Sequence, residues 1–281
     1  MVGDISCFRF TSALLLLGLL SACAPKAAVH LPIVEVADKP VEISAPKEAP
    51  TVSPSLVVDV RVRKAQFFDM LRPLVQAENR RIMEVRNSLL ELSQKADRKT
   101  NPYTPEEMDL IYPLEAKYRI LLSDNPDAAF WARLLKRVDE VPVELALAQA
   151  AHESAWGTSR TAKDGNNYFG QWCYQEGCGI APAHRKAGST QEAKVFSSAA
   201  ESVRAYIYNL NTSIAYKRFR GLRKQMRRRG EKLDATILAG GLATYPEHGA
   251  GYVKSIRVLI RHNQALMLQQ SPEMRMVHVV K

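Results

Sequence analysis

The chain has 281 residues, of which 46% are hydrophobic, and this length suffices for one buried core and a smaller second unit. Its formal net charge of +10 favours anionic neighbours. Because the N-terminus predicts export, we expect these neighbours to be lipid headgroups, lipopolysaccharide or the peptide carboxylates of a cell wall. Nucleic acid is excluded as an expected partner.

The first segment, residues 1–22, has the pattern of a lipoprotein signal peptide. The run from Leu14 to Leu20 is apolar apart from Gly18, and it is too short to span a bilayer permanently. Small residues then precede Cys23, which resembles the bacterial lipoprotein cleavage box. We therefore expect Cys23 to be lipidated and to begin the mature protein. An ordinary signal peptide with a chance cysteine is the alternative.

The residue after this cysteine bears on the location of the protein. An aspartate there tends to retain lipoproteins in the inner membrane, whereas this chain has Ala24. We expect the protein on the periplasmic side of a Gram-negative envelope, anchored to the outer membrane. Residues 23–60 carry prolines at positions 25, 32, 40, 46, 50 and 54, which predicts a semi-extended tether.

A helical lead-in is expected over residues 61–138. An apolar stripe at helical spacing predicts a first helix from Val62 to about Ala96, which Pro73 is positioned to kink or split. A second helix is predicted over residues 105–122, with Thr104 as its N-cap and proline at its first position. A third is predicted over residues 127–138.

The catalytic unit is expected over residues 139–268, followed by a tail over residues 269–281. Helices are predicted over 142–156, 199–216 and 252–267, and a loop with a small hairpin lobe over 166–196. Nine Lys or Arg residues between 217 and 232 predict a solvated basic face that attracts anionic wall or lipid. The expected fold is mainly α with a small β-lobe.

Glu153 is the candidate acid, at the end of a helix made of small residues. Ala146, Gln149, Ala150 and Gly157 share its helical face. The helix dipole and nearby aromatic rings would both favour the protonated acid, as proton donation to a glycosidic oxygen near neutral pH requires. A solvated glutamate at a helix end is the alternative.

Cys173 and Cys178 are five residues apart, and in an oxidising periplasm this spacing predicts a disulfide that closes a small loop. Half of a zinc site is the alternative, but it requires further ligands, and none is near in sequence. His152-Glu153 also lacks the second histidine of a zinc-protease helix, because Trp156 stands in that position. We expect no metal and no cofactor.

Two motifs carry a family resemblance. Gln149-Ala150-Ala151-His152-Glu153-Ser154-Ala155-Trp156-Gly157 and Asn166-Asn167-Tyr168-Phe169-Gly170 resemble the signature of the bacterial wall glucosaminidase domains, which are endo-β-N-acetylglucosaminidases. The wider match, through Gly170-Gln171-Trp172-Cys173 and Cys178-Gly179, resembles the Bax protein family of Gram-negative bacteria.

The resemblance implies a lysozyme-like glucosaminidase core preceded by the helical lead-in, with Glu153 as the essential acid. It also implies that tyrosines from a later segment enter the groove, and Tyr252 and Tyr245 stand there in this chain. We expect Asn167, Phe169 and Trp172 to help position the sugars.

The second carboxylate of such a site is not obvious. Glu192 lies at the family's usual distance after the helix glutamate, and Glu176 in the cysteine loop is its rival. A separation from Glu153 of roughly 6.5–9.5 Å would predict inversion and about 5–5.5 Å retention. If neither acts, the N-acetyl group of the substrate assists, or no water attack occurs.

The function expected from these observations is hydrolysis of the β-1,4 bond after N-acetylglucosamine in peptidoglycan glycan strands. A lytic transglycosylase, which releases anhydro-sugar ends, is one alternative. A wall-binding lipoprotein without activity is another. The sequence predicts no oligomeric state.

Overall fold

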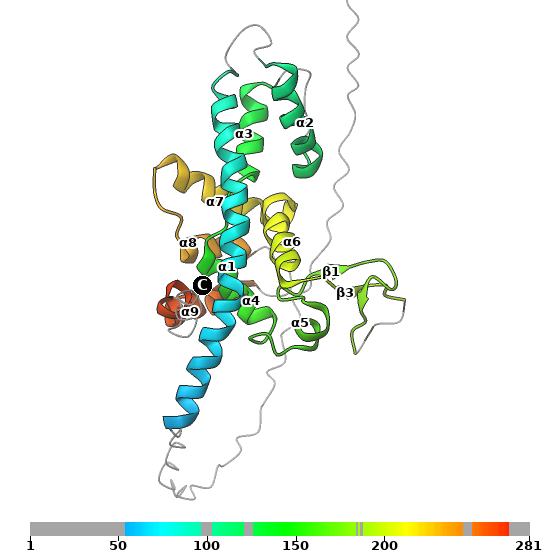
Figure 1. Ribbon diagram of the computed structural model, residues 1–281, viewed down its shortest axis with the longest axis vertical. Helices are drawn as coiled ribbons and strands as arrows, with labels where there is room; N and C mark the ends of the chain where they lie inside the picture. Colours follow the sequence, from blue (N-terminus) through cyan, green and yellow to red (C-terminus); the bar gives the residue numbers. More distant parts are fainter. Residues whose placement is uncertain are drawn as a thin grey trace, which may run out of the picture. The chain divides into compact units, whose positions relative to one another are not determined.

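The computed structural model describes residues 54–96, 103–120, 126–183, 185, 188–243 and 249–269 (Figure 1). The predicted signal peptide, Cys23, Tyr245 and the expected tail beyond residue 269 lie outside the described residues, so their predictions stand untested. The described part is mostly helical with one small antiparallel sheet, which confirms the expected fold class. None of its helices combines the length and the apolar character that a membrane crossing needs.

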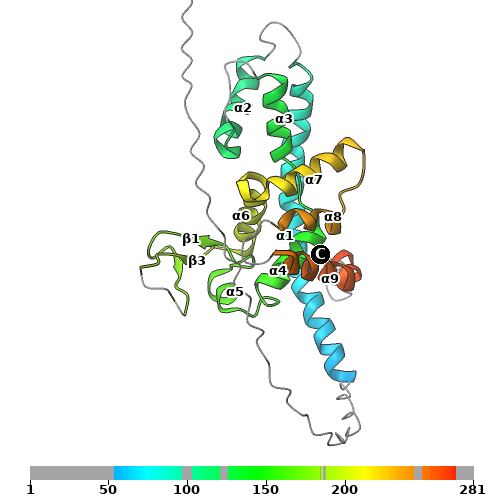
Figure 2. The same cartoon turned by 180° about the vertical axis from the view of Figure 1, so that it is seen from behind.

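Helix α1 (Pro54–Ser93) is the longest element, and four of the other helices pack against it (Figures 1 and 2). It contacts α3 (Ala128–Arg137), α4 (Val143–Glu153), α6 (Ala199–Thr212) and α9 (Gly249–Leu268). The helix begins inside the segment expected to be tether. It also continues through Pro73 without a break in the helical assignment. Buried apolar side chains recur along its length: Phe67, Phe68, Leu71, Val75, Ile82, Leu89 and Leu92.

The two short lead-in helices begin where their capping residues predict. Helix α2 (Pro105–Tyr118) starts after Thr104, whose hydroxyl accepts a hydrogen bond from the Glu107 amide while the Glu107 carboxylate accepts one from the Thr104 amide. This reciprocal pair satisfies two amides that the helix leaves unpaired. Asp127 caps α3 in the same manner by accepting from the Phe130 amide at 2.6 Å.

The β-lobe follows α4 and the short helix α5 (Arg160–Gly165). It consists of β1 (Trp172–Cys173), β2 (Gly179–Ile180) and β3 (Glu192–Lys194), with β3 in the middle and antiparallel to both. Trp172 pairs with Ala193, and Gly179 pairs with Lys194. Only glycine fits at position 179, since a Cβ there would lie 2.0 Å from the Ala193 carbonyl oxygen.

After α6 the chain forms several short elements before α9. They are η1 (Ile214–Tyr216), α7 (Lys217–Arg228), α8 (Ala235–Ala239) and η2 (Gly240–Leu242). The expected solvated face on α7 is only partly correct. Lys217, Arg218, Lys224 and Arg228 are exposed, but Arg220 and Arg223 are buried and Arg227 is half-buried.

The two buried arginines bond backbone carbonyl groups, Arg223 in the turn that leads from α3 into α4 and Arg220 near the end of α6. Arg223 donates to the carbonyl oxygens of Asp139 and Glu140 at 3.1 and 2.8 Å, and to the side chain of Asn211 at 2.8 Å. Arg220 likewise donates to the carbonyl oxygens of Leu210 and Ser213, near the end of α6. These guanidinium groups replace water at helix ends, which is why the basic pattern of α7 is partly internal.

The Asp139 carboxylate completes this arrangement. It is 2% exposed and faces Arg227 at 2.8 Å, Arg223 at 3.6 Å and Arg86 of α1 at 3.7 Å. Asn79 of α1 adds a pair of hydrogen bonds to the backbone of Val141. The start of α4 is therefore held by side chains from α1, α6 and α7, which sets the direction in which α4 carries Glu153.

Candidate functional site

Helix α4 ends at Glu153 because the backbone turns sharply after it. Ala155 and Trp156 adopt left-handed conformations with φ of 49° and 58°, and Gly157 follows with φ of 76°. The Ser154 hydroxyl donates to the Ala150 carbonyl oxygen at 2.6 Å and accepts from the Gly157 amide at 2.8 Å. Left-handed backbone is costly for residues other than glycine, so this turn is strained and must be held by its surroundings.

Aromatic side chains of α1 hold that turn. The Trp156 ring meets the rings of Phe67 and Phe68 edge to face, at centroid distances of 5.8 and 5.4 Å. The Lys64 ammonium lies 4.7 Å from the centre of the Trp156 ring. The predicted lead-in thus contributes directly to the shape of the site, which the local pattern around Glu153 did not reveal.

Glu153 is accessible and has defined neighbours. Its side chain is 24% exposed, and its carboxylate lies 3.6 Å from Nδ1 of His152. Tyr252 of α9 interacts with this carboxylate. Gly170, with φ of 61°, lies directly against it, because a Cβ at position 170 would be 3.3 Å from Glu153 Oε2. The glycine of the Tyr-Phe-Gly motif therefore leaves room for the carboxylate.

Asn167 and Phe169 build the turn that presents Gly170. The Asn167 amide group donates to the carbonyl oxygens of Gln171 and Lys194 at 2.7 and 2.9 Å, and its oxygen accepts from the Gln171 amide. Phe169 stacks on Tyr206 with a centroid distance of 3.9 Å. Both residues are buried. This burial argues against the direct sugar contacts predicted for them and favours a supporting role.

Two polar residues that the sequence analysis did not single out as functional stand behind Glu153. Gln149, one helical turn earlier on α4, donates from Nε2 to the Tyr252 oxygen at 2.9 Å. Its Oε1 accepts from the Tyr206 hydroxyl of α6 at 2.6 Å. Burial, followed by the charge of Glu153, raises the pKa of Tyr252 above its ordinary value, so Tyr252 stays a hydrogen-bond donor.

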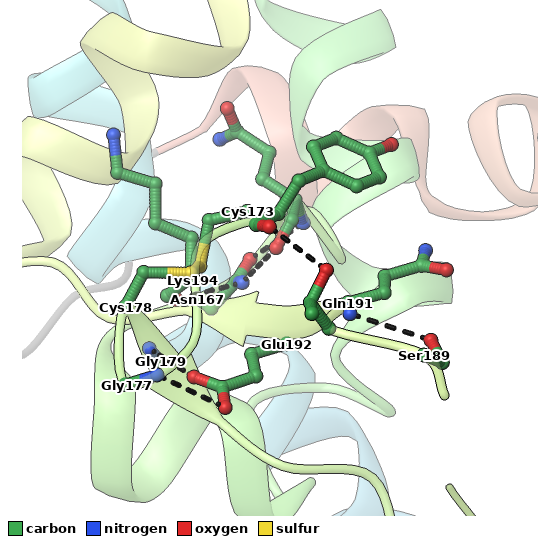
Figure 3. The surroundings of a disulfide bond; sticks show 12 residues. Asn167, Cys173, Gly177, Cys178, Gly179, Ser189, Gln191, Glu192 and Lys194 are labelled. Carbon is green, nitrogen blue, oxygen red and sulfur yellow. Dashed lines mark hydrogen bonds between the residues drawn. A yellow bond between two sulfur atoms is a disulfide. The ribbon is translucent and has the colours of Figure 1, made fainter. Parts of the chain in front are cut away.

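The β-lobe carries the predicted disulfide and the predicted second carboxylate (Figure 3). Cys173 and Cys178 are bonded, with their Cα atoms 6.2 Å apart. Glu192 of β3 reaches under the loop that they close and accepts from the amides of Gly179 at 2.8 Å and Gly177 at 3.2 Å (Figure 3).

These contacts give Glu192 a structural task. The backbone hydrogen bonds from Gly179 and Gly177, aided by the charge of Arg185, lower the pKa of the Glu192 carboxyl. Arg185 lies 3.5 Å from it. Since the side chain is buried and both of its oxygens accept from the disulfide loop, its geometry favours anchoring of that loop over service as a base.

The other predicted site residues differ in accessibility. Trp172 on β1 is 41% exposed, and its neighbour Tyr174 is 70% exposed. Trp172 thus retains the open ring that a sugar platform needs. Glu176 is exposed within the disulfide loop. Across the residues that the structure describes, no three His, Cys, Asp or Glu side chains are grouped to hold a metal ion.

Comparison with known proteins gives two matches. The family model described as mannosyl-glycoprotein endo-beta-N-acetylglucosaminidase matches residues 129–265, which begin in α3 and include Glu153, the β-lobe and most of α9. Protein bax of Escherichia coli (strain K12) is 33% identical over 205 residues, which cover 73% of this chain and 71% of that relative. No solved structure matches the chain significantly.

Proposed function

The chain belongs to the glucosaminidase family and is similar to Protein bax. On this premise we propose that it cleaves the β-1,4 bond after N-acetylglucosamine in peptidoglycan, with Glu153 as general acid. The family domain is lysozyme-like, as the resemblance implied, and it points to a glycoside hydrolase that acts on a cell-wall glycan such as peptidoglycan.

The observation that carries the assignment of Glu153 is its position. It ends helix α4, it remains about one quarter exposed, and a buried tyrosine and a glycine flank its carboxylate. In the proposed reaction the protonated carboxyl donates to the bridging oxygen of the glycosidic bond. The sugar on the other side of the bond then passes through an oxocarbenium-like transition state.

The exposed ring of Trp172 supports a role as a sugar platform in this proposal. Aromatic faces pack against the apolar faces of sugars, and the half-exposed ring leaves such a face open. Tyr252 serves differently, because its side chain is buried and its hydroxyl oxygen accepts a hydrogen bond from Gln149. Tyr245 is retained from the resemblance as a proposed groove residue.

A lytic transglycosylase is the second candidate function. It is favoured by the hydrogen bonds of Glu192, which hold this carboxylate in a structural role. A hydrolase with two carboxylates needs a second one free to act on water or on the sugar. Glu192 accepts hydrogen bonds from the disulfide loop, and Glu176 lies exposed within that loop. A single carboxylate suffices when an oxygen of the substrate attacks the oxocarbenium centre.

The test is digestion of purified sacculi with mass spectrometry of the soluble products. Hydrolysis gives reducing N-acetylglucosamine ends, whereas transglycosylation gives 1,6-anhydro ends that lack one water. We expect Glu153→Gln to lower the rate by about 10²–10⁴-fold at unchanged thermal stability. Glu91→Gln, at an exposed glutamate of α1, is the matched control and should retain the wild-type rate.

The outcomes separate the proposals. A fully active Glu153→Gln variant would end the assignment of the acid. Binding of sacculi without release of any product, by wild type and variant alike, would support a wall-binding lipoprotein instead. Glu192→Gln should loosen the β-lobe, seen as faster proteolysis of that segment. An equally severe loss of rate in a Glu192→Gln variant that remains folded would restore Glu192 as a catalytic residue.

We also propose that Cys23 is lipidated and anchors the protein to the periplasmic face of the outer membrane. The support is the apolar run ending in Ser21-Ala22-Cys23, followed by Ala24. Metabolic labelling with palmitate should mark the wild-type protein and not Cys23→Ser. A labelled Cys23→Ser variant, or an unlabelled wild type, would contradict the anchor.

A further inference from the structure

Two adjoining hollows lie on the surface formed by η1, α7, η2 and α9. The first, of about 440 Å³, borders η1 and the start of α7, and the second, of about 420 Å³, borders α7, η2 and α9. Arg218 and Ala243 line both hollows, which therefore form one continuous region that we call the α7–α9 surface. No described carboxylate lines it, and its cationic side chains are Lys217, Arg218, Lys254, Arg257 and Arg261.

The fold brings these charges together from two helices. Gly241 of η2 packs so closely on α7 that a Cβ at position 241 would lie 2.3 Å from the Cα of Phe219. This contact places Arg218, the residue before Phe219, beside the lining residues of η2 and α9. On α9, Lys254, Arg257 and Arg261 are spaced by three and four residues and therefore share one face of the helix.

Contacts among the described residues do not explain this clustering. Like charges three or four residues apart destabilise a helix. None of the five cations forms an ion pair with a described carboxylate, and Asp234 at the start of α8 instead accepts from the amides of Thr236 and Ile237. Four of the five are exposed, and Arg257 is half-buried with its Nε donating to the Thr236 carbonyl oxygen at 2.8 Å. An anionic partner would offset the mutual repulsion.

An apolar side chain stands at the edge of the same surface. Ile214 is 78% exposed, more than any other large hydrophobic side chain of the described residues, and it lines the first hollow with Lys217 and Arg218. Cations beside an exposed apolar group are typical of surfaces that bind membranes, because the cations attract headgroup phosphates and the apolar group enters the lipid. A soluble anion would neutralise the cations but leave Ile214 in water. The combination therefore favours a lipid surface.

We propose that the α7–α9 surface docks on an anionic phospholipid surface, with headgroup phosphates against its five cations and Ile214 at the boundary between headgroups and acyl chains. Arginine and lysine both bind phosphate oxygens through charge-assisted hydrogen bonds. The inference does not depend on the proposed role of Glu153. Together with the proposed anchor at Cys23, docking would turn this face of the domain toward the membrane.

The test uses the full-length protein with a fluorescent reporter at the apolar position. Ile214→Cys is labelled with nitrobenzoxadiazole, whose emission shifts to the blue when it leaves water, and is mixed with phosphatidylcholine vesicles with or without phosphatidylglycerol. We expect a blue shift only with phosphatidylglycerol, and its loss in about 0.5 M salt. Wild type carried through the same labelling gives the background from the other cysteines. Leu110→Cys, at an exposed leucine of α2, is the matched reporter elsewhere and should not shift.

Two double variants of equal net charge separate the proposed surface from overall charge. Lys254→Gln with Arg261→Gln removes two exposed cations of the surface, whereas Arg80→Gln with Lys163→Gln removes two exposed cations of α1 and α5. Each cation near an anionic membrane strengthens binding by roughly fivefold. We therefore expect the first pair to raise the lipid concentration for the half-maximal shift by about 25-fold, and the second pair by less than about twofold. Unchanged melting temperatures would show that the variants are folded.

Each outcome decides for or against docking. A shift that requires phosphatidylglycerol and is weakened selectively by the first pair supports the inference. An equal shift with phosphatidylcholine alone, or an equal loss in the two double variants, overturns it. So does the absence of any shift; if the first pair then lowers retention on purified sacculi, the cations bind an anionic wall polymer instead. Glu153→Gln should dock as wild type does, so failure of docking and failure of the proposed hydrolysis are observed separately.

Discussion

The two ends of α4 are built in opposite ways. At its start, Asp139 is almost completely buried among three arginines, and the polar side chains of Asn79 and Asn211 bond the adjoining backbone. At its end, Glu153 is one quarter exposed and stands beside a strained turn. Side chains from three other helices thus anchor the start of the helix, whereas its end stays accessible to a substrate.

The charged groups at the two ends of α4 also differ in their energetic roles. Burial of an ion pair rarely adds net stability, but removal of one partner leaves uncompensated charge in a poorly solvated place. Burial lowers the pKa of Arg223 to about 10, with Asp139 opposing the shift, so the guanidinium is charged at neutral pH. A catalytic acid needs the reverse situation, in which a proton is exchanged readily and substrate reaches the group.

The largest effect on stability is expected from removal of the buried carboxylate at the start of α4. Asp139→Asn leaves Arg86, Arg223 and Arg227 without their shared carboxylate, and we expect a loss of about 3–5 kcal/mol in the free energy of unfolding. Urea unfolding at pH 7 measures it. Asp164→Asn is the control, since its contact with Arg160 is exposed on both sides and its loss should cost less than about 0.5 kcal/mol. An equal effect in the two variants would contradict the structural role of Asp139.

A smaller loss in the free energy of unfolding is expected at low pH, because acid protonates the Asp139 carboxylate without removing the side chain. Burial alone would raise the pKa of Asp139, but Arg223, the hydrogen bond from Arg227, and Arg86 together lower it below its ordinary value. The unfolded chain then binds this proton more readily than the folded chain. The stabilisation is therefore present above about pH 4 and is lost as pH falls through the lower, folded value.

Urea unfolding of wild type and Asp139→Asn between pH 6 and pH 3 tests this linkage. Other carboxyl groups contribute to both proteins, so the difference between the two curves isolates Asp139. We expect the difference to shrink as the pH falls. A difference that stays constant over this range would show that the folded pKa of Asp139 is not depressed.

The smallest effect on stability is expected in the turn that follows Glu153 at the end of α4. Ala155 is exposed and has φ of 49°, so Ala155→Gly removes backbone strain at little loss of packing. We expect a gain of about 1 kcal/mol in the free energy of unfolding and a melting temperature higher by roughly 2–4 °C. Ala151→Gly, in the helical part of α4, should instead destabilise the protein by about 1 kcal/mol or more. A loss of stability in Ala155→Gly would show that the turn is not strained.

Much of the fold was predictable because its signals are local. The caps at Thr104 and Asp127, the disulfide between Cys173 and Cys178 and the end of α4 near Glu153 all depend on residues close together in the chain. The start of α1 was missed. Prolines before Pro54 predicted a tether up to residue 60, but proline is tolerated in the first turn of a helix, and α1 begins there.

The roles of individual polar residues were harder to predict. The arginines of α7 have the spacing of a solvated basic face, yet Arg223 bonds carbonyl oxygens 83 and 84 positions earlier in the chain. Asn167 and Phe169 stand in a motif typical of a sugar groove, but they support the turn from within. Only the contact partners distinguish these roles.

By itself, the sequence determined the helical class of the protein, its glucosaminidase signature and the helix-end position of Glu153. These follow from apolar periodicity, caps and one short motif, which act over a few residues. The tertiary structure decided which carboxylate is anchored and which is accessible. It also joined Tyr206, Gln149 and Tyr252 behind Glu153, across 57 and 103 positions of the chain. Burial and hydrogen bonding depend on such distant partners, so the pattern of neighbouring residues in the sequence cannot predict them.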